Sequence, residues 1–595
     1  MILKKARIKF QKFKEHGGIR KGIEQIKSLP IWLSLISVIL IIYDFGFDQS
    51  ESVQIILYRF YLLTLIAGSI SIISRYFFIK KLPSLRVWPF DLLIIAIIFG
   101  LIYRSYNDLF SIYREWLYAI VFILFIREFS SLKLDLKKKY LNPAQLFIIS
   151  FIGIIAIGTV LLKLPNATHS GITTVDALFT STSAVCVTGL IVVDTGSYFT
   201  LFGQMVLLIL IQLGGLGIMT FTSYFSYFFS GGSTYETQLM LKDITSSEKI
   251  ADVFKTLKKI ILLTFLVESI GAILIFTNLD ATVIPSISDR TFFAVFHTVS
   301  GYCNAGFSTL KNSLYEPAFR FNYPLHLIIA TLFIIGGIGF PIMFNFYKYI
   351  KHLILNKLFY WVSDKPKTYV PWVININTRI VLITSAILVV SGTVLFYLFE
   401  YNNTLEEHKG YGKLVTAFFG AVTPRTAGFN SIDTSAMYFS TTMIIFLLMW
   451  IGASPASTGG GIKTSTIAIG TLNFLSIARG KNRIELFNRE ISNDSVRRAF
   501  AIISLSLVII GGAVFFISWF DSDKDLLPIA FECFSAYSTV GLSLGITSEL
   551  SEASKIIIIG TMFIGRVSML TILIALLRKV KHFKYKYPTE EILIN

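Results

Sequence analysis

The feature that most constrains the fold of this chain is a series of predominantly apolar runs of about 18 residues or more, recurring along its whole length. A helix of about 20 residues crosses the hydrocarbon core of a membrane. Hydrophobic residues make up 54% of the 595 residues and charged residues only 15%, whereas soluble proteins carry about a quarter charged residues. The sequence therefore predicts an all-α polytopic membrane protein.

We predict about 12 spans. Four fall near 31–47, 53–78, 87–103 and 116–129, and eight follow near 145–165, 200–229, 258–278, 324–347, 378–400, 439–476, 498–520 and 553–578. The net charge is +18, because lysine and arginine outnumber the acidic residues. The basic residues are concentrated in the N-terminus, 133–139, 348–367 and 578–586, between or beside the spans. This pattern follows the positive-inside rule. It predicts a cytoplasmic N-terminus and argues against nucleic-acid binding.

Four connectors between the later spans are weakly charged, and each contains an apolar stretch too short to cross a membrane. Such a stretch enters the membrane only where it lines a protein-enclosed cavity. The four stretches end in similar motifs around Gly189, Gly306, Gly428 and Gly541, which are nearly evenly spaced (306 − 189 = 117, 428 − 306 = 122, 541 − 428 = 113). We therefore predict a fourfold repeat of span, re-entrant helix, glycine turn and span.

This repeated unit suits cation coordination. A re-entrant half-helix carries the chain to the membrane centre, and an extended tetrapeptide returns it. Glycine permits positive φ, so successive carbonyl groups can face inward. Four such strands around one axis supply rings of carbonyl dipoles that replace the hydration shell of an alkali cation. The alternative, that each glycine only relieves helix packing, is disfavoured by four copies at near-equal spacing.

The repeats also carry a family resemblance. The motifs are TSAVCVTGL at 182–190, NAGFS at 304–308, RTAGFN at 425–430, SPASTGGGIKT at 454–464, SAYSTVGLS at 535–543 and GR at 565–566. In these stretches the sequence resembles the Trk/Ktr/HKT superfamily of potassium transporters, of the bacterial TrkH/KtrB type. The resemblance covers about residues 140–580, and it does not cover the first four spans. It departs at Ser568-Met569, where the family usually has Gly-Pro.

The resemblance implies a single-chain potassium pore with fourfold pseudosymmetry, a homodimer, and gating by a separate cytoplasmic ring of nucleotide-binding subunits. The expected organisation is a basic cytoplasmic N-terminus (1–30), an accessory bundle of four extra N-terminal spans (31–140), pore repeats 1 to 4 (141–230, 231–350, 351–477 and 478–580) and a cytoplasmic tail (581–595). We expect a bacterial inner-membrane protein with no covalently bound cofactor. Nucleotide would act only through the separate subunit.

Specific residues follow from the resemblance. The selectivity filter would comprise, in chain order, Val187, Thr188, Gly189, Asn304, Ala305, Gly306, Thr426, Ala427, Gly428, Thr539, Val540 and Gly541, with K⁺ bound by backbone carbonyls. Glycine at all four key positions favours potassium, because a serine in the first filter accompanies sodium preference in the family. The run at 453–461, which cannot hold a straight helix, would close the pore beneath the filter. The gate residues would be Gly459, Gly460, Gly461, Lys463 and Arg566.

Two arginines need partners at membrane depth, because an unpaired guanidinium is costly there. We expect Arg425 to pair with Glu532, with Asp433 as the alternative. Arg566 is predicted at roughly one level with the small residues Gly215, Gly337 and Ala453 around the axis, where its charge would oppose cation flow. The alternative is a lateral salt bridge between helices. Cys186 and Cys303, each three residues before a key glycine, are expected to be buried and unbridged.

Other functions are less well supported by the sequence. A sodium-permeable member of the same superfamily is the runner-up, and a secondary transporter with inverted repeats is a further alternative. Each copy here holds two spans, so all four copies have the same orientation. No nucleophile elbow, paired carboxylate set or metal motif occurs, so we do not expect an enzyme. The N-terminal arginines lack the three-residue spacing of a voltage sensor.

Overall fold

The structure, a computed structural model, describes residues 17–78, 88–107, 114–129, 143–216, 253–362 and 374–576. The basic stretches at 133–139 and 578–586, the end of the span predicted at 200–229 and the tail at 581–595 lie outside the described residues. The chain divides into two compact units: one holds residues 1–137 with two short later segments, and the other holds most of the rest.

The first unit contains four helices where four extra spans are predicted: α2(Gly17–Gly46), α3(Glu51–Phe78), α4(Trp88–Asn107) and α5(Arg114–Phe129). Buried side chains such as Tyr61, Leu65 and Ile98 form its core. Asp91, only 1% exposed, pairs with Arg127 at 2.5 Å. This unit therefore has its own apolar core and a buried ion pair, as expected of a separate helix bundle.

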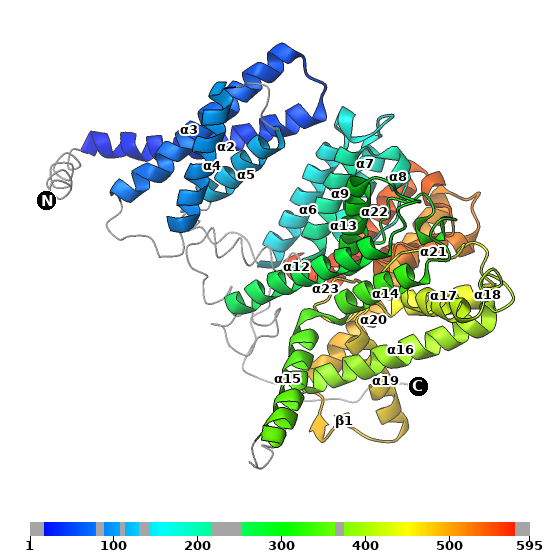
Figure 1. Ribbon diagram of the computed structural model, residues 1–595. Helices are drawn as coiled ribbons and strands as arrows, with labels where there is room; N and C mark the ends of the chain where they lie inside the picture. Colours follow the sequence, from blue (N-terminus) through cyan, green and yellow to red (C-terminus); the bar gives the residue numbers. More distant parts are fainter. Residues whose placement is uncertain are drawn as a thin grey trace. The chain divides into compact units, whose positions relative to one another are not determined.

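The second unit repeats one arrangement four times: a long helix, a short helix, a loop and a further helix (Figure 1). The long helices are α6(Pro143–Leu162), α12(Val253–Asn278), α16(Ile376–Glu400) and α20(Asn493–Phe520). The short helices are α7(Thr174–Cys186), α13(Ile287–Cys303), α17(Tyr411–Val422) and α21(Leu526–Ser538). The last helix of each repeat, which we call the closing helix, begins with α9(Leu201–Gly215), α14(Tyr323–Ile338), α18(Phe439–Trp450) or α22(Glu552–Val567). Each short helix falls on one predicted re-entrant stretch.

The short helices are held deep in the core. Thr173 and Ser286 cap α7 and α13 by accepting hydrogen bonds from the backbone N–H groups of Asp176 and Asp289. The C-terminal turns of all four are buried, in a core that includes Phe179, Phe296, Phe419 and Phe531. A helix this short depends on tertiary packing for its stability. Burial therefore fixes where each short helix ends.

The closing helices of the second, third and fourth repeats are broken. The chain bends by 100° at Gly339 between α14 and α15(Phe340–Val362), as Figure 1 shows. Loop 451–463 separates α18 from α19(Thr464–Ala478), and Ser568, at φ 73°, separates α22 from α23(Met569–Leu576). The break predicted within 439–476 is therefore confirmed. The spans predicted at 324–347 and 553–578 are also interrupted, at Gly339 and Ser568, because residues at positive φ cannot continue a right-handed helix.

Five described helices are long and apolar enough to cross a membrane, namely α2, α3, α12, α16 and α20, and the bent α14–α15 pair is a sixth candidate. The remaining apolar helices are shorter. After α19, a hairpin of β1(Glu485–Leu486) and β2(Arg489–Glu490) leads into α20. The helical membrane-protein class predicted from the sequence is thus confirmed.

Candidate functional site

Four loops follow the short helices, and we call them the glycine loops: 187–190, 304–307, 426–429 and 539–542. Each begins with a non-glycine residue in the left-handed region: Val187, Asn304, Thr426 and Thr539 have φ of 57°, 62°, 70° and 50°. Two residues later each loop has its key glycine, again at positive φ: 89° for Gly189, 71° for Gly306, 75° for Gly428 and 93° for Gly541. A side chain at these glycines would strain the backbone.

The glycine loops meet in a closed ring. Each key glycine lies against the carbonyl oxygen just before the key glycine of the next loop, and the fourth loop returns to the first: the pairs are Gly189 with Ala305, Gly306 with Ala427, Gly428 with Val540 and Gly541 with Thr188. A Cβ on any of these glycines would stand within 3.0 Å of that oxygen. The structure therefore brings together all twelve residues predicted for the filter.

Hydroxyl side chains behind the ring hold the loops in place. Gly189 and Gly541 donate their N–H groups to Oγ of Ser183 and Ser535, each at 3.1 Å. In the other two repeats the hydroxyl donates instead, from Ser300 to the Phe307 carbonyl and from Thr423 to the Phe429 carbonyl, each at 2.7 Å. We missed these residues in the sequence. The signal was present, as a serine or threonine five or six residues before each key glycine.

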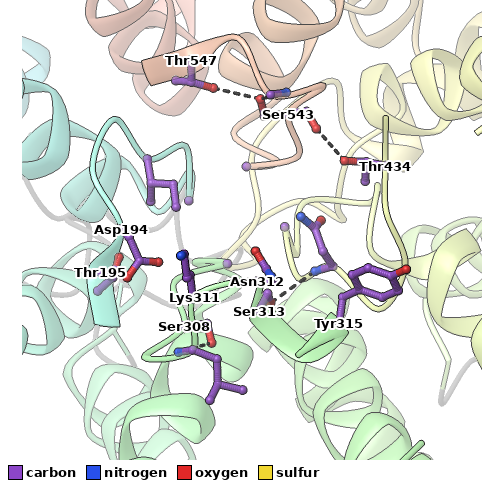
Figure 2. Close-up of a pocket in the computed structure, with 18 of the residues that line it drawn as sticks. Asp194, Thr195, Ser308, Lys311, Asn312, Ser313, Tyr315, Thr434, Ser543 and Thr547 are labelled. Carbon is purple, nitrogen blue, oxygen red and sulfur yellow. Dashed lines mark hydrogen bonds between the residues drawn. The ribbon is translucent and has the colours of Figure 1, made fainter. Parts of the chain in front are cut away.

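A cavity of about 510 Å³ lies on one side of the ring and is lined by all four key glycines. Figure 2 shows that its walls come from all four repeats, with Asp194, Lys311, Thr434 and Thr547 among the labelled side chains. Thr434 Oγ1 donates to the Ser543 carbonyl at 2.6 Å, which joins the third and fourth repeats. We call this cavity the vestibule.

Loop 451–463 covers the other side of the ring. A Cβ at Gly459 would meet Oγ1 of Thr426, and one at Gly460 would meet Oγ1 of Thr539. Thr458 Oγ1 lies 3.0 Å from Oδ1 of Asn304. The loop thus sits directly beneath three of the four glycine loops.

The loop is also bonded to the second repeat. The N–H groups of Ser454 and Thr458 donate to the carbonyls of Gly337 and Gly336 at 3.0 and 3.3 Å, and the Phe340 N–H donates to the Ala456 carbonyl at 3.3 Å. These bonds occur where α14 bends. Gly461, at φ 65°, forms the turn that leads back toward Gly452.

Two positively charged side chains donate hydrogen bonds to the backbone carbonyl groups of this loop. Lys463 Nζ donates to the Gly459 carbonyl at 2.7 Å and to that of Gly460 at 3.3 Å. Arg566 Nη1 donates to the Thr458 carbonyl, and Nη2 donates to the Gly214 carbonyl at 2.6 Å. Arg566 therefore bridges the loop and the end of α9. Among the described residues it forms no salt bridge, and its two side-chain bonds go to backbone carbonyls.

The pairing predicted for Arg425 is also wrong. Within the described ranges, the one side-chain partner of Arg425 is Ser385, whose Oγ lies 3.4 Å from Nη2. Glu532 instead accepts hydrogen bonds from the hydroxyl groups of Ser543 and Thr547. Asp433 accepts from Ser435. The physical reason is local. The Glu532 carboxylate accepts hydrogen bonds from hydroxyl groups eleven and fifteen residues later in its own repeat, so it does not need the guanidinium.

The described cysteines are all buried and unbridged, as predicted for the first two: Cys186, Cys303 and Cys533. Gly215, in the glycine run at the end of α9, packs against Cys303. The glycines at 214, 336 and 565 lie against the carbonyls of Val185, Tyr302 and Tyr537, each four residues before a key glycine. These are close packing contacts between a closing helix and its own short helix.

A helical membrane protein whose four repeats converge on one ring of backbone carbonyls belongs to the class of channel-like ion transporters. Comparisons with known proteins specify the family. The TrkH family model, described as a cation transport protein, matches residues 119–585. The chain is 36% identical to the Ktr system potassium uptake protein B of Vibrio alginolyticus over 454 residues, which cover 76% of this chain and 94% of that protein.

It is also 34% identical to the potassium/sodium uptake protein NtpJ of Enterococcus hirae, covering 77% of this chain and 98% of that protein. The crystal structure of TrkH from Vibrio parahaemolyticus has the same fold, with a TM-score of 0.58 over 88% of this chain and 97% of that one, at 16% identity. The chain belongs to the TrkH family of cation transport proteins.

Proposed function

We propose that this chain is the pore-forming membrane subunit of a potassium uptake system. The observation that carries the proposal is the closed ring of the four glycine loops, in which each key glycine faces a carbonyl oxygen of the next loop. Rings of backbone carbonyls can replace the hydration shell of an alkali cation without any side-chain charge. The potassium uptake protein B of Vibrio alginolyticus, to which the chain is 36% identical over 454 residues, supports the same substrate.

In the proposed path, K⁺ enters through the vestibule and sheds water at the carbonyls of residues 187–188, 304–305, 426–427 and 539–540. The four repeats are then arranged with fourfold pseudosymmetry about the ion path. Loop 451–463, with Lys463 and Arg566 on its carbonyls, is the gate. Fixed positive charges just beneath the filter raise the barrier to a cation, and the barrier falls when the loop and its cations move aside.

The assembly that we propose is a homodimer in the bacterial inner membrane with its N-terminus in the cytoplasm. A separate cytoplasmic ring of nucleotide-binding subunits, of the TrkA/KtrA kind, would control the gate, and no nucleic acid would be involved. The resemblance to the TrkH/KtrB-type membrane subunits supports this arrangement. The N-terminal unit, with its own core, is proposed to be an accessory bundle.

Sodium permeation is the second candidate, because the relative NtpJ is named for both potassium and sodium uptake. Glycine at all four key positions favours potassium. A Gly189→Ser variant would add a side chain at φ 89°, against the Ala305 carbonyl. The ring would then be distorted, and the preference for potassium over sodium should fall.

The test is growth of a bacterium deficient in potassium uptake on low potassium, with and without this chain, together with ion flux in proteoliposomes. We expect the wild type to restore growth and Gly189→Ser to lower the K⁺/Na⁺ flux ratio by about tenfold or more, equivalent to about 1.4 kcal/mol of selectivity. Gly171, also at positive φ but with no atom near its Cβ position, provides the control Gly171→Ser. Equal flux ratios in the two variants would refute the filter assignment.

A further inference from the structure

Arg425 immediately precedes the third glycine loop, yet its guanidinium group is poorly satisfied. Its single hydrogen bond among the described residues is the long one from Nη2 to Ser385 Oγ, at 3.4 Å. Its Nε is buried and has no acceptor. No ion pair to Arg425 is present in the described part of the chain. A guanidinium in a membrane protein is costly without an anionic partner or water, so an acceptor is missing from this site.

The guanidinium lines a cavity of about 350 Å³ formed by α14, α16, the end of α17 and the first part of loop 451–463. Apart from Arg425 and Ser385, every lining residue is apolar; Phe333, Leu382 and Ala386 are examples. An apolar cavity with one convergent cationic group is suited to a ligand that has an apolar body and one anionic end.

The cavity opens at an exposed part of α16, a helix long and apolar enough to span a membrane. Val390, one of its lining residues, is 63% exposed, and α16 is one of the helices able to span the membrane. Ser385 lies about 14 Å along α16 from its first residue, at 1.5 Å per residue. That position is near the centre of a hydrocarbon core of about 30 Å. The ligand must therefore come from the lipid phase.

A long-chain carboxylate meets these requirements. A carboxylate accepts two parallel hydrogen bonds from an arginine, which would satisfy the buried Nε as well as an Nη. Its alkyl chain would lie against the apolar walls and leave toward the lipid past Val390. A phospholipid phosphate has the same anionic chemistry, but it stays charged and therefore at the membrane interface, whereas a fatty acid can reach the centre as the neutral acid and ionise beside the guanidinium. We propose that this cavity is a binding site for the carboxylate of a long-chain fatty acid.

Such a ligand would act on the gate. Ala453 lines the cavity, and the next residue, Ser454, donates its N–H to the Gly337 carbonyl at 3.0 Å. Gly337 also lines the cavity. A bound chain would hold α14 and loop 451–463 in the arrangement seen here, beneath the ring. Fatty acid should therefore lower cation flux; this part of the inference rests on the proposed function.

The experiment measures binding of radiolabelled oleate to the full chain in nanodiscs of phosphatidylcholine. Ala386→Phe fills the cavity, and Ile387→Phe is the matched control, because Ile387 is 61% exposed on the same helix and does not line the cavity. We expect oleate binding at about one per chain, weakened about tenfold or more in Ala386→Phe and Arg425→Gln. Ile387→Phe should bind like the wild type. Methyl oleate, which lacks the charge, should not displace oleate.

Each variant is checked by size-exclusion chromatography, and Val390→Trp at the mouth replaces Ala386→Phe if that protein does not fold. Equal oleate binding in Ala386→Phe and wild type would overturn the site. Displacement by a few molecules of phosphatidylglycerol per chain would assign the anion to a phospholipid and overturn the fatty-acid proposal. Oleate binding without potassium flux would refute the proposed transport function while leaving the site intact.

Discussion

At the scale of single residues, two positively charged side chains carry much of the control of cation conduction that we propose. Lys463 and Arg566 donate to carbonyls of three consecutive residues, 458–460, which lie beneath the ring. These carbonyls are therefore unavailable to a cation leaving the filter. In the path that we propose, the same two side chains also place positive charge below the ring. Both effects oppose conduction while loop 451–463 keeps this position.

Removing the charge of Arg566 should increase flux. Arg566→Gln keeps a donor for the Thr458 or Gly214 carbonyl but loses the positive charge and the second bond. We expect potassium flux in proteoliposomes to rise about tenfold, because a barrier change of about 1.4 kcal/mol has that effect. Arg566→Lys, which retains the charge, is the control and should stay near the wild-type flux. A glutamine variant that folds but conducts no faster would contradict the barrier role.

Lys311 is a second test of charge, on the other side of the ring. It lines the vestibule together with Asp194 and Asp433, and Figure 2 labels both Lys311 and Asp194. Its positive charge lowers the local concentration of cations. Lys311→Gln should raise potassium uptake about twofold or more at low ionic strength. The gain should shrink as salt screens the charge, since the Debye length falls to about 8 Å at physiological ionic strength.

Uptake at several salt concentrations measures this effect. Lys409→Gln removes a lysine that does not line the vestibule and is the matched control. An increase in Lys311→Gln that is independent of salt would argue against an electrostatic cause.

At the scale of elements, the closing helices owe their shape to single residues at positive φ. Ser568 is the clearest case, because it takes the place where the family usually has glycine, yet it adopts φ 73° and ends α22. Its N–H donates to the Ile564 carbonyl at 2.9 Å. The helix is therefore interrupted here without a Gly-Pro pair, and the backbone of Ser568 is strained because serine disfavours positive φ.

The strain at Ser568 predicts opposite outcomes for one substitution at two sites. Ser568→Gly should stabilise the protein by about 1 kcal/mol, because glycine adopts the left-handed region freely. Ser391→Gly, within α16, should destabilise it by about 0.5–1 kcal/mol. Thermal unfolding in detergent measures both. Destabilisation by Ser568→Gly would refute the strain at Ser568, and stabilisation by Ser391→Gly would contradict the cost of glycine within α16.

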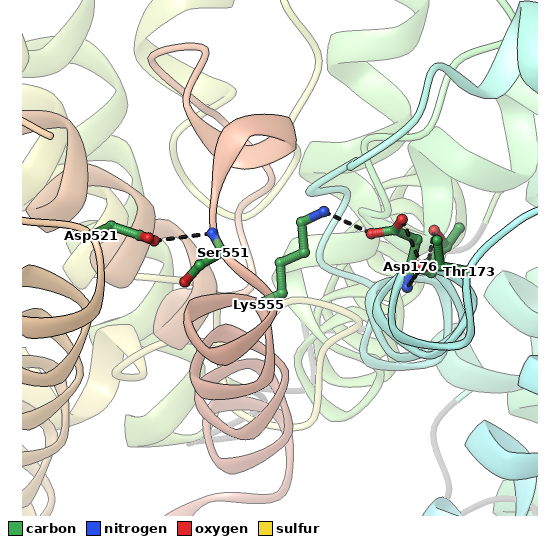
Figure 3. A network of polar contacts seen from close by, with 6 residues as sticks. Thr173, Asp176, Asp521, Ser551 and Lys555 are labelled. Atoms are coloured by element: carbon green, nitrogen blue, oxygen red, sulfur yellow. Dashed lines mark hydrogen bonds and ion pairs between the residues drawn. The ribbon is translucent and has the colours of Figure 1, made fainter. Parts of the chain in front are cut away.

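At the scale of the whole second unit, the ring of loops must be closed between its first and last repeats. Lys555 of α22 pairs with Asp176 of α7 at 2.8 Å, with side-chain exposures of 12% and 17% (Figure 3). Asp521 accepts from the Ser551 N–H at 3.1 Å and fixes the start of α22. Residues almost 400 positions apart are thus joined directly, between the first and fourth repeats.

Breaking this closing pair should lower stability. Because the pair is largely buried, Lys555→Met leaves Asp176 without its charged donor, at a cost of about 1–3 kcal/mol. The double variant Lys555→Met/Asp176→Asn should lose less than the sum of the two single changes. Lys524→Met is the control, because its partner Glu549 is 61% exposed and such pairs contribute little. Additive losses measured by thermal unfolding would refute the coupling.

The sequence alone determined the class of protein and the places of the four short helices and of the positive-φ glycines that follow them. These features follow from local chemistry. Long apolar runs require a membrane, short ones cannot cross it, and glycine marks a backbone at positive φ. The break at 453–461 was predictable for the same reason, because proline and glycine act within a few residues of themselves.

Only the tertiary structure decided which groups meet across the repeats. It set the order of the loops around the ring, the bend at Gly339, and the hydroxyl partners of Glu532 in place of Arg425. It also placed Arg425 in an apolar cavity beside Ser385, forty residues away in the chain. Charge and spacing could not select these partners, because contacts between distant segments depend on how whole helices pack and not on the residues near each group.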